Sequence, residues 1–184
     1  MHDPETNAWK GLAAGLVGGL AATYVMTQFQ EIAGKLEKKL KENDHSEHPQ
    51  HSAKRGQQES GKGDEGGEDA TVKAASELSH TLFHHDLSPE EKKTAGPAMH
   101  YGFGILTGGA YGALAEIAPA VTRGVGAPFG TAVWLGADEV AVPAFGLSGP
   151  PWESPASVHA RALAAHLVYG LTTEAVRRLV RRAL

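Results

Sequence analysis

The chain has 184 residues, a length typical of one domain, and its 17 Lys and Arg residues against 21 Asp and Glu residues give a formal net charge of −4. This weakly acidic balance argues against a nucleic-acid-binding protein, because such proteins usually present a strongly basic face. The chain contains no cysteine, which excludes disulfides, thiolate zinc sites and a cysteine nucleophile.

The charges are concentrated in one segment. Residues 35–95 hold ten of the 17 basic and 13 of the 21 acidic residues, so a polar insert interrupts an otherwise apolar, glycine-rich chain. We therefore divide the chain into three parts: an N-terminal tail with a first membrane helix (1–34), a polar insert (35–96), and a three-helix membrane unit with a basic C-terminus (97–184).

Four segments are predicted to cross a membrane. Residues 11–30 form an uncharged run of 20 residues, long enough as a helix to span a bilayer core of roughly 30 Å. Residues 94–115 form a second run in which only His100 can ionise. The later segments contain acidic or histidine side chains, which are tolerated at membrane depth only when they find partners in a bundle. The predicted helices lie near residues 10–30, 97–120, 124–147 and 156–176.

The alternative is a soluble protein in which these helices are buried. A run of 20 uncharged residues is long for a soluble core helix, and Gly and Ala bury too little area to drive folding in water. A cleaved signal peptide is also disfavoured, because the first ten residues carry two acids and a single lysine instead of a basic leader. We therefore expect an all-α membrane protein: a four-transmembrane-helix bundle with a long polar, partly disordered loop between helices 1 and 2.

Glycines recur at every fourth residue in the predicted membrane helices. Residues four apart turn by only about 40° on an α-helix, so they form one slanting stripe along which two backbones can approach closely. The rows predicted to pack helices are Gly11, Gly15 and Gly19 in the first segment and Gly104, Gly108 and Gly112 in the second.

The polar insert is predicted to be partly helical. Residues 35–45 extend the first helix as a charged, amphipathic tail, whereas residues 43–69 lack the apolar side chains needed for a core and are expected to be disordered. A helix can form again over residues 68–83. Ser88 then begins a short helix as the first residue of a capping box with Glu91.

Two further features belong to the insert. Pro97 is predicted to mark the entry to the second membrane helix. Six of the ten histidines lie in the insert, some spaced by three or four residues, but no cysteine accompanies them. We interpret them as solvated side chains and predict no metal and no cofactor.

Titratable side chains are predicted to meet in the half of the membrane next to the insert. A carboxylate in lipid must be neutral, paired or hydrated, so Asp138 or Glu139 beside His166 could share a proton or hold a cation, or could simply be a structural hydrogen-bonded group. Because the two acids are adjacent, about 100° apart on a helix, we expect one to face the bundle and the other a neighbour or a cavity. The full set is His100, Asp138, Glu139, His159 and His166.

A second group lies near the opposite surface. Glu116 and Glu174 are predicted to pair with Arg123 and Arg177 as a structural clamp, and Glu116 is also a candidate proton or cation ligand. Four spans would place both chain ends on one side. The basic C-terminus favours the cytoplasmic side for that end, which leaves the insert outside.

The motifs around these groups resemble the YagU-like bacterial inner-membrane proteins, a family grouped under a domain of unknown function. The carriers are the segments YGALAE (111–116), GADE (136–139) with Pro143, and HLVYG (166–170) followed by Glu174. The resemblance extends over about 97–182 and, more loosely, the first helix. It implies a multi-pass inner-membrane protein, and it implies no reaction.

Two hypotheses of function follow. The first is an inner-membrane protein that binds or conducts protons or cations through its intramembrane acids and histidines. The second is a membrane scaffold or accessory subunit packed through its glycine rows, with a homo-oligomer or a membrane protein as its partner besides the lipid bilayer. No nucleophile triad, P-loop or metalloprotease motif is visible, so we expect no enzyme, and no nucleic-acid partner.

Overall fold

The computed structural model of the protein describes residues 4–47 and 69–184, and every regular element in those two ranges is helical. The predicted all-α class is therefore confirmed. The elements in chain order are α1 (Pro4–Glu47), α2 (Ala70–Phe83), α3 (Pro89–Ile117), η1 (Pro119–Thr122), α4 (Ala127–Trp134), the π-helical segment η2 (Leu135–Ala141), α5 (Val142–Ala144), η3 (Pro151–Glu153) and α6 (Ala156–Ala183).

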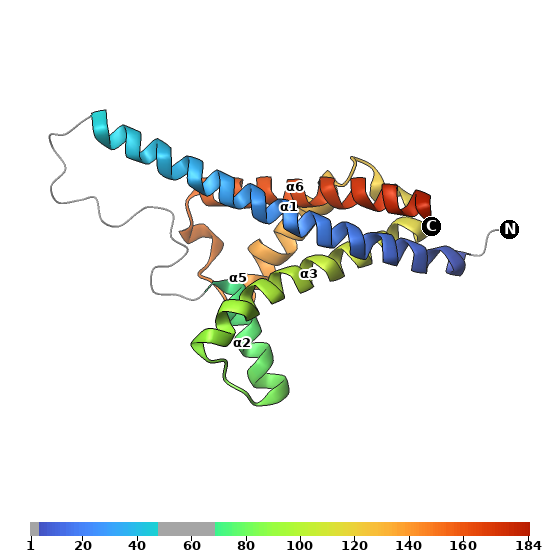
Figure 1. The fold of residues 1–184 in the computed structure, drawn as a ribbon, viewed down its shortest axis with the longest axis horizontal. Helices are drawn as coiled ribbons and strands as arrows, with labels where there is room; N and C mark the ends of the chain where they lie inside the picture. Colours follow the sequence, from blue (N-terminus) through green and yellow to red (C-terminus); the bar gives the residue numbers. More distant parts are fainter. Residues whose placement is uncertain (1–3, 48–68) are drawn as a thin grey trace.

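Helices α1, α3 and α6 form the main bundle (Figure 1). Helix α1 packs against both α3 and α6, and α4 packs on α6. The start of α1 and the end of α6 lie together, since the Lys10 ammonium donates a hydrogen bond of 2.9 Å to the Leu184 carbonyl. We call this the terminal end. The opposite end, where α2 and η3 lie, is the insert end.

The two predicted glycine rows face each other across the antiparallel contact between α1 and α3. A Cβ placed on Gly15 would overlap the Gly108 carbonyl oxygen, and one placed on Gly108 would lie 2.6 Å from the Cα of Gly19. Gly11 meets Gly112 in the same way one turn further along. The two backbones are thus in direct contact, which only glycine permits at these positions.

A second close contact joins α4 to α6. The backbone of Gly130 lies against the His166 carbonyl, and Gly126 against that of Gly170. Gly126 also has a φ of 91°, in the left-handed region that favours glycine, where the chain turns into α4. This contact fixes how α4 and the segment after it lie on α6.

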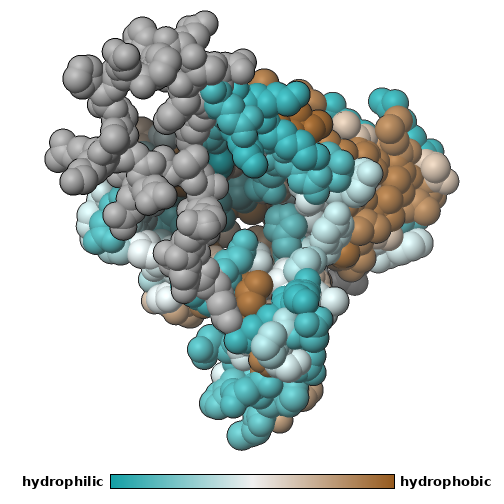
Figure 2. Space-filling model, turned by 60° about the vertical axis from the view of Figure 1, so that its left-hand side comes forward, coloured by the Kyte–Doolittle hydropathy of each residue, from teal (hydrophilic) through white to brown (hydrophobic). Residues whose placement is uncertain are grey.

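The interior of the bundle combines small residues, Met26 and two tyrosines with buried polar groups, whereas many of its large aliphatic side chains point outward. The largest side chains that are fully buried are Glu174, Thr23 and Thr173. By contrast Leu106 and Ile117 on α3 are 68% and 66% exposed. Viewed toward the insert end, hydrophilic residues cover the near end while hydrophobic residues gather on the flank (Figure 2).

By length and apolar composition, one of the described helices could cross a membrane, namely α1 over Asn7–Leu40. The buried core helix of a soluble protein and an N-terminal signal sequence have the same features. Of the four crossings expected from the sequence, one is thus matched by a described helix of suitable length and composition.

Several predicted boundaries need correction. The extension of the first helix through residues 35–45 is confirmed, because α1 continues to Glu47. Of the stretch expected to be disordered, residues 48–68 lie outside the described residues. The helix expected over 68–83 is confirmed as α2. Pro97 does not begin a helix but lies inside α3, which runs without a break from Pro89.

The third predicted helix differs from the observed structure more than the other predicted helices do. Instead of a regular helix over 124–147, the chain is helical over Ala127–Ala144 with a π-helical middle. The divisions expected after residues 34 and 96 both fall inside continuous helices, α1 and α3.

The glycine contact predicts the effect of one added methyl group. Gly108→Ala should lower the free energy of unfolding by about 1–3 kcal/mol, because the new Cβ would overlap the backbone of α1. Gly102→Ala is the matched control on the same helix: a Cβ there meets nothing within 4 Å, so alanine should be neutral or stabilise by up to about 1 kcal/mol. Thermal unfolding in detergent, followed by circular dichroism, measures both. Equal midpoints for the two variants would contradict the close contact.

The capping box predicted at Ser88 is present at the start of α3. The Ser88 hydroxyl and backbone N–H donate to the Glu91 carboxylate at 2.7 and 2.8 Å, and the Glu91 N–H donates back to the Ser88 hydroxyl oxygen. These bonds, chiefly that from the Ser88 hydroxyl, lower the pKa of Glu91 from 4.5 to about 2, with a smaller contribution from His85.

A pH titration tests this cap. A depressed carboxyl pKa stabilises the folded start of α3 above about pH 4.5, and this contribution is lost as the pH falls through the folded value of about 2. In a carbon-detected NMR titration, the Glu91 carboxyl should titrate near pH 2 in the wild type. Its pKa should move up toward 4.5 in Ser88→Ala. An unchanged titration in that variant would show that Ser88 does not hold the carboxylate.

Candidate functional site

The site at the insert end is built on the π-helical segment η2. Its i→i+5 hydrogen bonding makes a wider turn than an α-helix, and such segments are frequent at functional sites. Asp138 and Glu139 lie in its middle, opposite α6. Each acid reaches a different histidine, and the two histidines lie seven residues apart on α6, which is two turns along one face.

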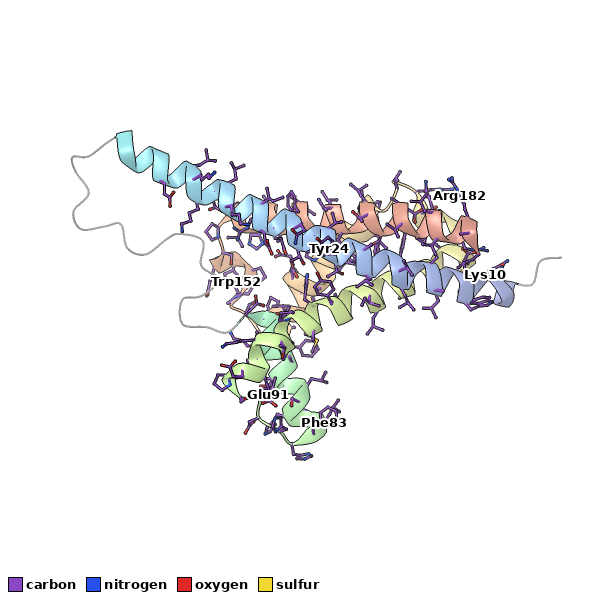
Figure 3. The ribbon with its side chains drawn as sticks, viewed as in Figure 1. Lys10, Tyr24, Phe83, Glu91, Trp152 and Arg182 are labelled. Atoms are coloured by element: carbon purple, nitrogen blue, oxygen red, sulfur yellow. The ribbon has the colours of Figure 1, made fainter. Side chains whose placement is uncertain are left out.

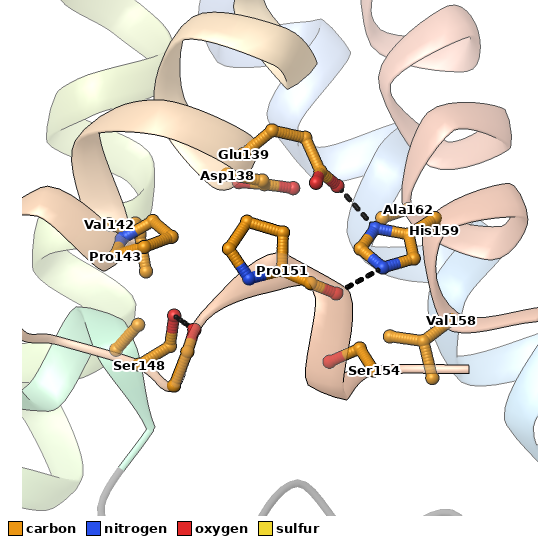
Figure 4. A pocket seen from close by; sticks show the side chains of 12 residues that line it. Asp138, Glu139, Val142, Pro143, Ser148, Pro151, Ser154, Val158, His159 and Ala162 are labelled. Atoms are coloured by element: carbon orange, nitrogen blue, oxygen red, sulfur yellow. Dashed lines mark hydrogen bonds and ion pairs between the residues drawn. The ribbon is translucent and has the colours of Figure 1, made fainter. Parts of the chain in front are cut away.

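Glu139 and His159 form a tight pair. The Nδ1 atom of His159 lies 2.6 Å from the Glu139 carboxylate, and its Nε2 atom lies 2.9 Å from the Pro151 carbonyl oxygen (Figure 4). A carbonyl can only accept, so Nε2 must carry a hydrogen and donate it. The short contact at Nδ1 then requires one further proton between the imidazole and the carboxylate, whichever of the two holds it. The geometry therefore requires the two side chains to hold one proton between them.

Asp138 and His166 form a looser pair. The buried His166 donates from Nδ1 to the Ala162 carbonyl at 2.9 Å, as a carbonyl partner again requires. The same nitrogen lies 3.6 Å from the Asp138 carboxylate, beyond hydrogen-bond length. Asp138 is thus beside an imidazole but not bonded to it, so it can gain or lose a proton without breaking a hydrogen bond.

Both acids line one open pocket of about 260 Å³. The sequence predicted one acid facing the bundle and the other a neighbour or a cavity, whereas the structure places both on this one pocket. The walls come from η2, the loop with η3, the first turns of α6, and Ala70 of α2. In Figure 4, Ser148 and Ser154 lie on the other side of Pro151 from the two acids, and the Ser148 hydroxyl donates to the Gly149 carbonyl at 3.1 Å.

His100 does not join either pair within the described structure. Its ring makes an edge contact with the neighbouring Tyr101, with centroids 6.0 Å apart. Of the insert histidines, His45, His48 and His51 lie outside the residues whose side chains are described. Within residues 4–47 and 69–184 no group of three or more His, Asp and Glu side chains is arranged to hold a metal ion.

The terminal end contains a buried ion-pair cluster centred on Glu174, whose side chain is 0% exposed. Its carboxylate accepts hydrogen bonds from the guanidinium groups of Arg177 and Arg178 and, at 3.0 Å, from the Tyr111 hydroxyl. These donors satisfy both carboxylate oxygens, which is what makes a buried charge tolerable.

Glu116 extends the cluster from α3 to α6. It accepts two hydrogen bonds from Arg181, at 2.8 and 3.2 Å, and lies 3.8 Å from Arg177. Arg181 also donates to the side chain of Asn7 on α1. The cluster thus ties together all three helices of the main bundle at this end. Glu116 has its charge matched here and takes no part in the pocket at the insert end.

Arg123 was expected to pair with Glu116 or Glu174, and this is wrong. Its side chain is exposed in the turn after η1, and the two carboxylates pair with arginines of α6 instead. Arg181 was missed, although Glu174, Arg177 and Arg181 follow one another at spacings of three and four residues and therefore share one face of α6.

Two tyrosines in the interior were also missed by the sequence analysis. The Tyr169 hydroxyl donates to the Gly104 carbonyl at 2.6 Å and contacts the Thr107 hydroxyl. The Phe129 ring stacks on Tyr111 and lies beside Tyr169. A polar hydroxyl in an otherwise apolar glycine-rich helix was the signal that could have identified both.

The chain belongs to the family described as protein of unknown function (DUF1440), which matches residues 74–175 and therefore covers α2 through most of α6. Both acid–histidine pairs, Tyr111, Glu116 and Glu174 lie within the matched range. No curated protein and no solved structure matches the chain.

Removing the central carboxylate tests the cluster. Glu174→Ala should destabilise the protein by about 3–5 kcal/mol, because it leaves buried guanidinium groups without their partner. Glu153→Ala is the matched control, since Glu153 is exposed and its loss should change stability by no more than about 0.5 kcal/mol. Denaturant unfolding in mixed micelles compares the two. A Glu174→Ala variant as stable as the control would show that the cluster contributes nothing.

Proposed function

We propose that the chain is a multi-pass inner-membrane protein that takes up protons at the pocket of Asp138, Glu139, His159 and His166. The membrane location is supported by the distribution of side chains. A bundle whose interior holds Gly, Thr and a buried carboxylate, and whose surface carries large apolar side chains, is matched to lipid rather than to water. The likeness of its motifs to the YagU-like proteins supports a bacterial inner membrane.

The Glu139–His159 pair carries the proton-binding proposal. Its 2.6 Å contact needs one shared proton, and in the same pocket lies Asp138, whose carboxylate has no hydrogen-bonded partner among the described residues. Protons suit this arrangement better than metal ions, because each acid already faces an imidazole and no third ligand group converges on them in the described part of the chain.

The pocket is open at the insert end, whereas the Glu174 cluster closes the terminal end with matched charges. We therefore propose uptake of protons from the insert side. Passage through the bundle would require the cluster to open. No group in this arrangement forms a nucleophile–base pair, so we propose no catalytic activity.

A scaffold role is the second candidate. It is favoured by the protruding part of α1, where Ile32, Leu36 and Leu40 are exposed at four-residue spacing. In this alternative the acid–histidine pairs are structural hydrogen bonds only.

Proton uptake can be measured directly. The protein is reconstituted in vesicles, and infrared difference spectra are recorded for pH steps between about 8 and about 5, the range in which histidine-linked groups titrate. Wild type should show a carboxyl protonation band that is absent from Asp138→Asn/Glu139→Gln. Glu153→Gln serves as control, because this exposed residue lies outside the pocket, and its difference band should match that of the wild type.

The same vesicles can contain a pH dye to detect transfer across the bilayer. Identical difference spectra for wild type and the double variant would overturn the proton-binding proposal and leave the scaffold role standing. A dye response in the wild type that the double variant lacks would extend the proposal from uptake to conduction.

A further inference from the structure

Helix α2 has an apolar stripe that nothing in the described structure covers. Leu78 and Leu82 lie one turn apart and are exposed, Leu82 by 60%, and Phe83 at the end of the helix is exposed as well. The side that packs on α3 is a different one: Val72 lies against Gly96, and the Ser76 hydroxyl is buried. The stripe is turned by roughly 120° from this packed side.

The remaining side of α2 is polar. It carries Lys73, Glu77 and His80, of which Glu77 and His80 are exposed. A helix with an apolar stripe, a charged side and low overall hydrophobicity is typical of a helix that lies in a membrane interface.

The placement of α2 fits that description. In Figure 1 it runs across the direction of α1 and α6, and in Figure 2, after a 60° turn about the vertical axis, its lobe still projects sideways from the bundle. Its first residue, Ala70, lines the pocket at the insert end. Trp152, which is 83% exposed, belongs to the loop at the same end (Figure 3). Tryptophan is enriched where membrane helices leave the hydrocarbon.

We propose that α2 is an interfacial helix whose Leu78 and Leu82 insert into the boundary between headgroups and acyl chains of the surrounding bilayer. The occupant is lipid rather than a protein because α2 packs on α3, and α3 itself presents the exposed Phe103 and Leu106. A bilayer that covers Phe103 and Leu106 would also contact α2, because α2 packs on the same helix. This inference rests on the proposed membrane location of the bundle.

Depth-dependent fluorescence quenching tests it. In the full chain with Trp9→Phe, Trp134→Phe and Trp152→Phe, one tryptophan is introduced at a time: Leu82→Trp on the stripe, or His80→Trp on the polar side. The variants are reconstituted in phosphatidylcholine vesicles with bromine near the headgroup end of the acyl chains. Quenching of Leu82→Trp should exceed that of His80→Trp at least about twofold, because an interfacial helix buries its apolar side about 5–10 Å deep.

A third variant, Leu106→Trp in the same background, separates the membrane location of the bundle from the interfacial position of α2. Leu106 is suited to this because it lies midway along α3 and is exposed. Quenching of Leu106→Trp with none for Leu82→Trp would overturn the interfacial helix and leave the membrane location intact. Absence of quenching in all three variants, although the protein floats with the vesicles, would overturn both. Equal quenching of Leu82→Trp and His80→Trp would contradict the proposed orientation of α2.

Discussion

The contact between the backbones of α1 and α3 is the constraint on which the rest of the bundle depends. Glycines at Gly15, Gly19 and Gly108 bring the two helices so close that no large side chain fits between them. Along this contact the interior is left to glycine, alanine and threonine, and many of the large aliphatic side chains of the two helices point outward. Close packing of small residues is the usual way in which helices associate in lipid, and it supports the membrane location that we propose.

The polar groups kept inside this bundle are gathered on one helix. Helix α6 presents His159 and His166 toward the insert end and Glu174 and Arg177 toward the terminal end, so a single face of one helix carries both sites. The two sites differ in how completely they are satisfied. The terminal cluster has a donor for each carboxylate oxygen, as a permanent structural element requires, whereas the pocket keeps a loosely paired acid beside a shared proton. This difference is the basis on which we propose a structural role for the terminal cluster and proton binding for the pocket.

Much of the local structure could be predicted from the sequence because it depends on neighbours along the chain. The capping box at Ser88, the long extension of α1 and the position of α2 are of this kind. The glycine rows could be recognised, but the partner of each row could not. The π-helical segment Leu135–Ala141 escaped prediction, because its composition does not distinguish it from an α-helix. The exposed position of Arg123 was not predictable either. Its expected depth in the membrane suggested a pair with Glu116 or Glu174, whereas the turn after η1 places its side chain on the surface.

The central claim is that this bundle is built for lipid, and its behaviour on extraction tests that claim most directly. Membranes from cells that produce the full chain are washed at alkaline pH without detergent and then sedimented. The protein should remain entirely in the membrane pellet and enter solution only with detergent, because its outward-facing leucines and phenylalanines have no other solvent. A chain that leaves the membrane fraction and elutes as a monodisperse monomer in detergent-free buffer would contradict the account.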